Sequence, residues 1–398
     1  MRNPGEGEVE LTTLTSMRVS RRGATTASLR TFLTGMDWIL IVVAGMLLVL
    51  GVVMIKTSTS HAIAGNPGYF ETRQIIFLLP ALVACIGFAM FDVRRLQPYP
   101  RVLLGGLLGA LLVVFAIGVT VRGANAWISV GPFQLQPSEF GKIALVVILA
   151  SLAVERTEDI DRWRTTLMLT AVAAGPALLI FLEPDLGMAL IYVAILGGVL
   201  FVAGTPWKHF AASGIVIATS VVMAFGVLPS AGIHVVKGYQ LQRMTAFLNG
   251  GSGNTAGYQL AQSKTAIGSG GALGKGVGGA TQTVYNFLPE DHTDFIFAVV
   301  GEVFGFVGAA TVVVLFGILM WRALRITAQA ATQFEQIVAA GICAMFGFEV
   351  VVNIGMNVGL MPITGIPLPF VSYGGSHIVA DMAAVGVLLS IHRRRLAI

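Results

Sequence analysis

The chain has 398 residues, of which 55% are hydrophobic and only 11% are charged, whereas soluble globular proteins carry roughly 25% charged residues. Its formal net charge is +5, and most of the excess lies in short segments between apolar runs, which indicates membrane topology rather than nucleic-acid binding. The composition excludes an ordinary soluble enzyme and predicts an integral membrane protein.

The chain begins with a polar segment rich in Thr, Ser and Arg. This segment leads into the first apolar run without a small-residue cleavage pattern close after it, so we expect a cytoplasmic tail over residues 1–35 rather than a cleaved signal peptide. The membrane domain is expected over residues 36–392, and a short basic cytoplasmic C-terminus over residues 393–398.

Ten apolar segments follow, and most are long enough to cross a hydrocarbon core as a helix of about 20 residues. They cover approximately residues 37–55, 75–91, 102–120, 140–154, 166–182, 187–203, 210–228, 295–320, 336–359 and 377–391. The sequence therefore predicts an all-α polytopic membrane protein with about ten transmembrane helices. An even number of spans places both termini on one side.

The orientation follows from the positions of Lys and Arg, which are retained on the cytoplasmic side in short loops. With the N-terminus inside, 17 of the 25 Lys and Arg residues fall in the inner segments, so both termini are predicted to be cytoplasmic. The outer connections at residues 121–139, 229–294 and 360–376 are longer and rich in Gly, Pro, Gln and aromatic residues. Because long connections are usually functional or disordered, we expect the chemistry in these three, above all in the large extracytoplasmic loop 229–294 between the seventh and eighth spans.

The segment QPSEFGK at residues 136–142 opens the fourth span and places Glu139 and Lys142 three residues apart on one helix face. Ionisable residues inside a membrane segment indicate a functional site, and a structural ion pair is the alternative. Glu349 and Asp381, inside the ninth and tenth spans, leave the same choice between ion relays and buried polar contacts. The segment EPDLG at residues 183–187 is typical of a tight turn.

The segment GSGGALGKGVGG at residues 268–279 resembles a phosphate-binding loop, because glycines free backbone amides and Lys275 adds charge. As a Walker motif it fails, since Ser269 replaces the first glycine and Gly276 replaces the Ser or Thr that binds magnesium. Two interpretations stay open, a contact of Lys275 with a lipid phosphate and a flexible hairpin.

The run FLPEDHTDFIFAVVGE at residues 287–302 ends the long loop and starts the eighth span. It places Glu290, Asp291, His292 and Asp294 at the membrane surface. Asp294 fits a helix N-cap, which is a common position for Asp before an apolar run, and it also fits a partly desolvated general base. Spacing alone favours the cap.

The last outer loop, MPITGIPLPFVSYGGSH at residues 361–377, combines three prolines with three glycines. We expect a stiff, non-helical backbone that lines a groove for a lipid tail or head group, because such backbone near membrane depth needs protein or a cavity beside it. Ser372 is a candidate substrate contact in this loop.

Several strings in this order carry a resemblance to a known family. They are WISVGPFQLQPSEFGK, EPDLG, YQLQR, GYQLAQSKTAIGSGGALGKG, FLPEDHTDFIFAVVGE and NVGLMPITGIPLPFVSYGGS. From about residue 36 to about residue 392 the chain resembles the RodA/FtsW family of shape, elongation, division and sporulation proteins. The string IPLPF favours the RodA branch.

The resemblance implies a ten-helix glycosyltransferase of the bacterial cytoplasmic membrane, which polymerises lipid II on the outer face together with a class B penicillin-binding transpeptidase. It implies that Asp294, in the family's HTDF string, is the essential acidic residue. It also places Trp127, Glu139 and Lys142 around a central cavity. We add Arg243, Lys275, Glu290 and Ser372 as candidate substrate-binding residues.

The sequence departs from the family pattern at several positions. Ala126 stands where many members carry Arg, which weakens a phosphate-binding role there, and Arg122 is the nearest substitute. Glu183 stands where Gln is usual, Val303 where a second acidic residue often follows Glu302, and His377 where Ser is usual. None of these departures removes Asp294.

The expected reaction is attack of an acceptor sugar hydroxyl on an anomeric carbon that is linked through pyrophosphate to a polyprenyl chain. It requires a base and positive charge for the leaving group. Asp294 suits the first task; Lys275, Arg243, Lys142 or a divalent cation, Mg or Mn, suits the second. Two other classes remain as alternatives, a lipid II flippase or transporter and a non-catalytic scaffold of the wall-synthesis complex.

Overall fold

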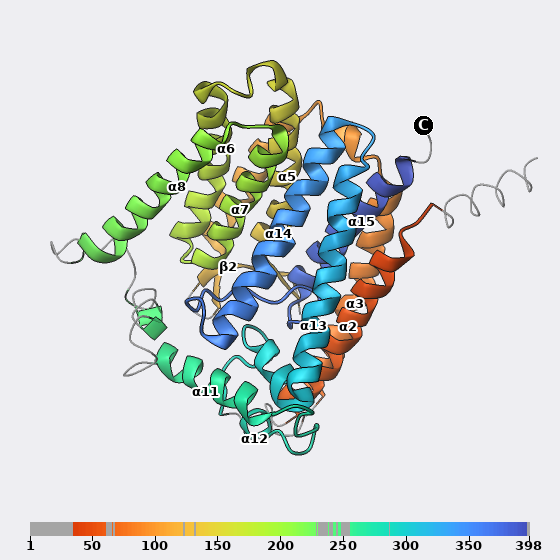
Figure 1. Ribbon diagram of the computed structural model, residues 1–398, viewed down its shortest axis with the longest axis vertical. Coiled ribbons are helices and arrows are strands. Elements are labelled where there is room, and N and C mark those ends of the chain that lie inside the picture. Colours follow the sequence, from red (N-terminus) through yellow and green to blue (C-terminus); the bar gives the residue numbers. More distant parts are fainter. Residues whose placement is uncertain are drawn as a thin grey trace, which may run out of the picture.

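The computed structural model shows a bundle of long helices with smaller elements at one end (Figure 1). The structure describes residues 35–60, 66, 68–121, 124–130, 133–227, 229, 238, 242–243, 246–247, 255–285 and 287–395. Helix is the dominant element because a chain in lipid must satisfy its backbone N–H and C=O groups internally.

Nine helices of the described residues are long and apolar enough to cross a membrane. They are α2 (Trp38–Thr59), α3 (Tyr69–Met90), α4 (Pro100–Ile117), α5 (Pro137–Glu155), α6 (Trp163–Leu182), α7 (Leu186–Ala203), α13 (Ile296–Ala328), α14 (Gln333–Val358) and α15 (Gly375–Arg394). The predicted all-α polytopic fold is therefore confirmed. Each of the nine overlaps one of the ten predicted segments.

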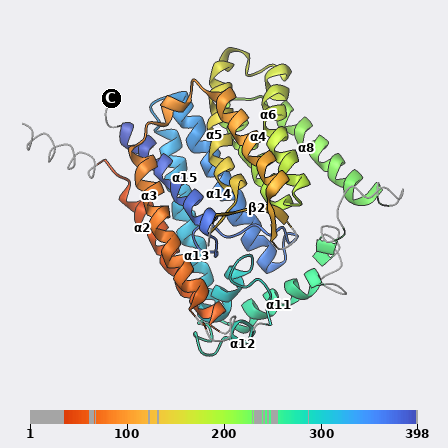
Figure 2. The same ribbon diagram turned by 180° about the vertical axis from the view of Figure 1, so that it is seen from behind.

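The remaining predicted segment, residues 210–228, falls on α8 (Trp207–Val222) and the π-helical turn η3 (Met223–Val227). The 16 residues of α8 alone are too few to cross the hydrocarbon core, and η3 extends the helical path by five residues. Both ribbon views show α8 leaning away from the other helices (Figures 1 and 2).

Both ends of the described chain meet at one end of the bundle, which we call the basic end. Asp37 caps α2 by accepting a hydrogen bond from the backbone N–H of Leu40. Its carboxylate also accepts a hydrogen bond of 2.8 Å from Nε of Arg322 in α13 and lies 3.8 Å from Nδ1 of His392 in α15. Residues 37 and 392 therefore lie at the same end of the bundle.

The opposite end, which we call the loop end, carries the shorter elements. Strands β1 (Val119–Val121), β2 (Ala124–Val130) and β3 (Phe133–Leu135) form an antiparallel sheet in the order β1-β2-β3. Helices α11 (Thr255–Ser269) and α12 (Thr281–Val284) lie at the same end, in the described part of the long loop (Figure 1). Two 3-10 helices, η1 (Val93–Leu96) and η2 (Thr157–Asp159), complete the described elements.

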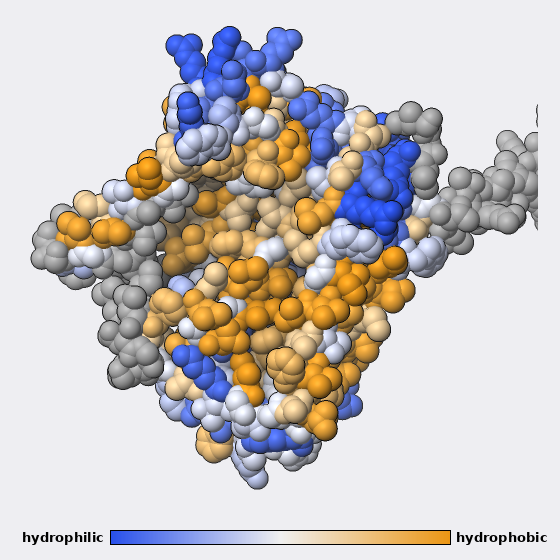
Figure 3. Space-filling model, viewed as in Figure 1, coloured by the Kyte–Doolittle hydropathy of each residue, from blue (hydrophilic) through white to orange (hydrophobic). Residues whose placement is uncertain are grey.

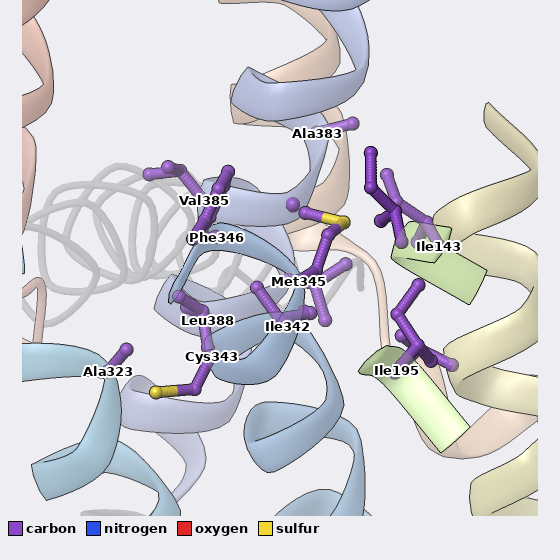
Figure 4. Packing of buried hydrophobic residues seen from close by; sticks show 14 of the residues in the cluster. Ile143, Ile195, Ala323, Ile342, Cys343, Met345, Phe346, Ala383, Val385 and Leu388 are labelled. Carbon is purple, nitrogen blue, oxygen red and sulfur yellow. The ribbon is translucent and has the colours of Figure 1, made fainter. Parts of the chain in front are cut away.

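The centre of the bundle is made by α5, α14 and α15, most of whose residues are buried. Ile342, Met345 and Phe346 of α14 lie among side chains of α5, α7 and α15 (Figure 4). Gly198 of α7 faces Ala344 of α14, and small residues at such contacts let membrane helices approach closely.

The outer helices expose their apolar side chains. On α2, α3 and α4 the exposed residues include Val49, Leu79 and Val102, and α4 lies on the outside beside α5 and α6 (Figure 2). Apolar residues dominate the middle of the surface, with hydrophilic residues gathered toward the two ends (Figure 3). This is the surface that a lipid solvent requires.

Candidate active site

Asp294 lies at the loop end, two residues before the first turn of α13. It does not cap that helix: the N-cap is Phe295, and no side chain caps α13 from that position. The N-cap interpretation was wrong, and the amide oxygen of Asn357 in α14 accepts instead from the Ala298 N–H of the first turn. The Asp294 side chain is half-buried.

Arg243 and Asp294 converge on the backbone of Gly365. A β-carbon built on Gly365 would lie 3.1 Å from Nη1 of Arg243 and 3.5 Å from Oδ2 of Asp294. Gly365 has φ of 79°, a left-handed conformation that glycine adopts without strain. The last loop therefore passes directly beside both charged side chains, and the structure brings together two of the predicted site residues that are 51 positions apart in the chain.

Asp185 is a third charged residue of this region, which sequence reasoning placed only in a turn. Its Oδ1 caps α7 by accepting a hydrogen bond from the Met188 N–H at 2.9 Å, and its Oδ2 accepts one from Nε2 of Gln136 at 3.2 Å. Burial raises the pKa of Asp185 to about 6, and the charges of Arg243 and Asp294 act on it with opposite signs. The EPDLG string could have indicated a functional role for Asp185, because a turn between two spans does not require two acidic residues.

Glu183 lies behind Asp185 and is 2% exposed. Burial and the nearby charge of Asp185 raise the pKa of Glu183 to about 7. Its Oε1 has no hydrogen-bond partner within the part of the chain that the structure describes. The α6–α7 turn thus holds two carboxyl groups that take up protons near neutral pH.

The HTDF segment is hydrogen-bonded to the last loop through the buried Ser372. The hydroxyl of Ser372 donates to the Thr293 carbonyl at 2.6 Å and accepts from the Leu368 N–H at 2.8 Å. The Tyr373 N–H donates to the His292 carbonyl at 2.9 Å. Ser372 is 0% exposed, so the geometry gives it a supporting role, and direct substrate contact stays a prediction that this arrangement does not favour.

Glu290 begins the tight turn that leads to Asp294. Its φ of 58° is in the left-handed region, and its carboxylate accepts a hydrogen bond from the Thr293 hydroxyl at 3.0 Å. The neighbouring Asp291 is 5% exposed, and burial raises the pKa of its carboxyl although His292 lies 3.1 Å away. Glu290 is half-buried at this turn, and its role in substrate binding stays a prediction.

Five ionisable residues of the spans form a buried ion cluster, which consists of Glu139, Lys142, Glu349, His377 and Asp381. Nζ of Lys142 lies 2.8 Å from Glu139 and 2.6 Å from Glu349. The His377 ring lies between Glu139, at 3.3 Å from Nδ1, and Asp381, at 3.2 Å from Nε2. Their side chains are at most 5% exposed, so of the two interpretations of these residues the geometry fits buried polar contacts.

Glu139 and Lys142 are buried, so in this arrangement neither side chain presents a surface to a substrate. The predicted pairing of the two is confirmed, because an ammonium group in a buried position needs opposite charges around it. The transport alternative also finds little support, since the buried charges are bonded to one another rather than spread along a path.

Lys275 lies in a glycine-rich segment that packs into a break of α13. Gly305 interrupts α13 with φ of 65° and ψ of −159°, and the N–H groups of Lys275 and Gly276 donate to the carbonyls of Glu302 and Val303. The Lys275 ammonium lies 3.5 Å from the buried Glu302 carboxylate and 3.3 Å from the Thr281 hydroxyl. The flexible-hairpin interpretation is wrong, because these bonds fix the segment; a lipid-phosphate contact by Lys275 would compete with Glu302.

Trp127 is a half-buried residue of β2, opposite Val119 of β1. Its neighbour Ala126 is 2% exposed, so an arginine there would need a different backbone position. Arg122, the suggested substitute, lies outside the described residues. The structure leaves the substrate-binding prediction for Trp127 untested.

No group of three or more His, Cys, Asp and Glu side chains that could hold a metal ion occurs among the residues described above. The divalent cation stays a prediction. Among the described residues, the Arg243 guanidinium is a positive group that approaches the same glycine as Asp294.

Comparison with known proteins shows which family this chain belongs to. The FtsW/RodA/SpoVE model, described as a cell cycle protein, matches residues 37–396. Stage V sporulation protein E of Bacillus subtilis (strain 168) is 32% identical over 367 residues, which are 90% of this chain and 98% of that protein. A protein of Trichlorobacter lovleyi named "Probable peptidoglycan glycosyltransferase FtsW" is 38% identical over 366 residues, 89% and 92% of the two chains.

Two solved structures share the fold. A chain of a peptidoglycan synthase complex that coordinates polymerization and crosslinking matches with a TM-score of 0.76 and 30% identity, and the match covers 90% of this chain and 98% of that chain. The rod shape determining protein RodA of Thermus thermophilus matches with a TM-score of 0.66 and 28% identity, over 90% and 97% of the chains.

Proposed function

The chain belongs to the FtsW/RodA/SpoVE family, and from this premise we propose that it is a peptidoglycan glycosyltransferase that polymerises lipid II into glycan strands. The observation that carries the proposal is the convergence of the Asp294 carboxylate and the Arg243 guanidinium on the Gly365 backbone at the loop end. A base and a cation side by side are what glycosyl transfer from a pyrophosphate needs.

Asp294 is the proposed general base. Its half-buried carboxylate stands where an acceptor sugar could bind at the loop end, and it would take the proton from the acceptor hydroxyl as the oxygen attacks the anomeric carbon. The released proton then resides on Asp294 until it passes to water.

Arg243 is the proposed partner of the leaving group. The bond from the anomeric carbon to the pyrophosphate oxygen breaks as the new glycosidic bond forms, and the guanidinium stabilises the negative charge on the leaving pyrophosphate. Lys142 is buried and Lys275 lies beside Glu302, which favours Arg243 among the basic candidates.

A single displacement is sufficient for this chemistry. A β-linked product from an α-linked donor requires inversion at the anomeric carbon, so one base acts and no protein nucleophile is needed. Asp185 is in electrostatic range of both Arg243 and Asp294, and we propose that its negative charge orients the guanidinium.

The proposed location is the outer face of the bacterial cytoplasmic membrane, with both termini in the cytoplasm. The support is the clustering of Lys and Arg at the basic end, which includes Arg94, Arg322 and Arg394, because such residues are retained on the inner side. The loop end would then open where lipid II is presented.

We propose a class B penicillin-binding transpeptidase as the partner, because a similar solved chain belongs to a complex that couples polymerization to crosslinking. Whether the chain belongs to the RodA branch stays a prediction, since its relatives include proteins named for division and for sporulation.

The test is polymerisation of labelled lipid II by the purified protein with its transpeptidase partner. Asp294→Asn keeps the shape of the side chain and removes the base, so we expect product formation to fall by at least about 100-fold. The matched control is Asp161→Asn, the same change at an exposed residue of the turn between η2 and α6. It should leave the rate unchanged.

Three outcomes would contradict the proposal. A wild-type complex that makes no polymer but moves lipid II between leaflets would indicate the flippase. A complex whose polymer comes entirely from another subunit would indicate the scaffold. A folded Asp294→Asn protein that polymerises like the wild type would remove Asp294 from the reaction.

A further inference from the structure

The carbonyl oxygen of Asp294 is held by two amides of another helix. Nδ2 of Asn353 donates to it at 2.9 Å, and Nδ2 of Asn357 donates to it at 3.1 Å. Both asparagines lie on α14, four residues apart and therefore on one helix face, and both are 0% exposed. Asn357 opens the string NVGLMPITGIPLPFVSYGGS, but no role was predicted for either residue from the sequence.

Asn353 connects the two sides of the site. The same Nδ2 group donates at 2.8 Å to the carbonyl of Ile366, which directly follows Gly365. One amide thus binds the backbone that carries the Asp294 carboxylate and the backbone on which Asp294 and Arg243 converge. A shift of this side chain would change the distance between the base and the loop beside it.

Asn357 replaces the missing cap of α13. Its Oδ1 accepts at 3.1 Å from the Ala298 N–H in the first turn of α13, and this N–H also donates to the Phe295 carbonyl at 3.0 Å. The Ser263 hydroxyl of α11 donates to the Asn357 carbonyl at 2.9 Å, which ties the long loop to the same position. The first turn of α13 is therefore held by α14 and α11, and Asn357 takes the capping position that spacing favoured for Asp294.

We propose that Asn353 and Asn357 are positioning residues that hold the Asp294 carboxylate in its reactive place against Gly365 and Arg243. This inference rests on the proposed function, in which Asp294 is the base. Neither amide points its donors at substrate; each acts through the Asp294 peptide. Because a misplacement of about 1 Å at a reacting group lowers rates by about 100-fold, loss of these bonds should act mainly on kcat.

The experiment compares Asn353→Leu and Asn357→Leu with the wild-type complex, using labelled lipid II and measuring kcat, KM and the thermal midpoint. Leucine keeps the branched shape and the number of side-chain heavy atoms and removes the amide donors and acceptor. We expect kcat to fall by about 10- to 100-fold while KM for lipid II changes less than about 3-fold. Asn353→Ala, which also removes the donors and adds no charge, should show the same loss where a leucine variant fails to fold.

The matched control is Gln74→Leu. Gln74 is another 0% exposed amide, and it bonds to the last loop at the Ser372 carbonyl and the Gly374 N–H without contacting Asp294. It should lower the thermal midpoint about as much as the asparagine variants and leave kcat close to the wild-type value.

The outcomes separate this inference from the proposed function. Equal values of kcat in Asn353→Leu and Gln74→Leu, with Asp294→Asn inactive, would overturn the positioning role alone. An active Asp294→Asn protein would overturn the proposed function and the positioning role together. A fall of kcat confined to the asparagine variants would support the inference.

Discussion

Two groups of ionisable side chains in this protein differ in what surrounds them. In the buried ion cluster, Lys142 lies within 3 Å of two carboxylates and His377 lies between two, and no side chain of the cluster is more than 5% exposed. At the loop end, Asp294 and Arg243 are half-buried, so part of each residue is exposed at the surface.

The comparison distinguishes charged groups that stabilise the fold from charged groups that are available for a reaction. Inside the bundle, each charge must be compensated by the others because lipid and packed side chains offer no water. At the loop end, two partly exposed charges of opposite sign face one backbone, and burial raises the pKa of Glu183 to about 7 and that of Asp185 to about 6.

The largest effect is expected from removing the cation of the buried ion cluster. Lys142→Met leaves the carboxylates of Glu139 and Glu349 without their closest positive charge, and uncompensated buried charge costs about 3–5 kcal/mol. The thermal midpoint in detergent should fall strongly. Adding Glu349→Gln to Lys142→Met should recover part of the loss, and a single variant as stable as the wild type would refute the structural assignment.

The next effect is a pH dependence at the loop end. Burial raises the pKa of Glu183 from its ordinary value of 4.5 to about 7, so the folded protein holds a proton that the unfolded chain releases. Stability from this group is complete below pH 4.5 and is lost as the pH rises through about 7, by an amount on the order of 3 kcal/mol.

Thermal unfolding at several pH values checks this. The midpoint of the wild type should fall as the pH rises from about 5 to about 7. Glu183→Gln should reduce the slope between about pH 4.5 and 7, and the slope that remains below about pH 6 should come from Asp185. Parallel curves for the variant and the wild type would show that Glu183 does not carry the dependence.

A smaller effect on activity is expected from Asp185. Asp185→Asn removes the negative charge that acts on Arg243 but keeps an oxygen that can cap α7. Since Asp185 acts through Arg243, we expect kcat to fall by about 10-fold, less than for removal of a group that touches the reacting atoms. A rate equal to that of Asp161→Asn would exclude Asp185 from the site.

The smallest effect is expected from an exposed ion pair. Lys56 at the end of α2 lies 3.3 Å from Glu71 of α3, and its side chain is 66% exposed. Exposed pairs contribute about 0–1 kcal/mol, so Lys56→Ala should barely change the thermal midpoint. A loss comparable to that of Lys142→Met would show that burial does not decide the strength of ion pairs in this protein.

The spans and their order could be predicted from the sequence because an apolar run of about 20 residues has one solution in lipid. The pairing of Glu139 with Lys142 also followed from their spacing on one helix. The role of the candidate base, Asp294, could not be predicted in this way. Spacing favoured a cap for Asp294, and only the resemblance to a family indicated chemistry there.

The tertiary structure decided what spacing left open. Lys142 meets Glu349 across 207 positions of the chain, and Ser372 meets Thr293 across 79. Asn353 and Asn357 reach Asp294 from α14, and Asp185 lies in electrostatic range of Asp294 from the α6–α7 turn. Such contacts depend on how helices pack, which local periodicity does not encode. The sequence by itself determined a multi-span membrane protein with acidic residues at one end, and packing determined which of those residues are paired and which are left for chemistry.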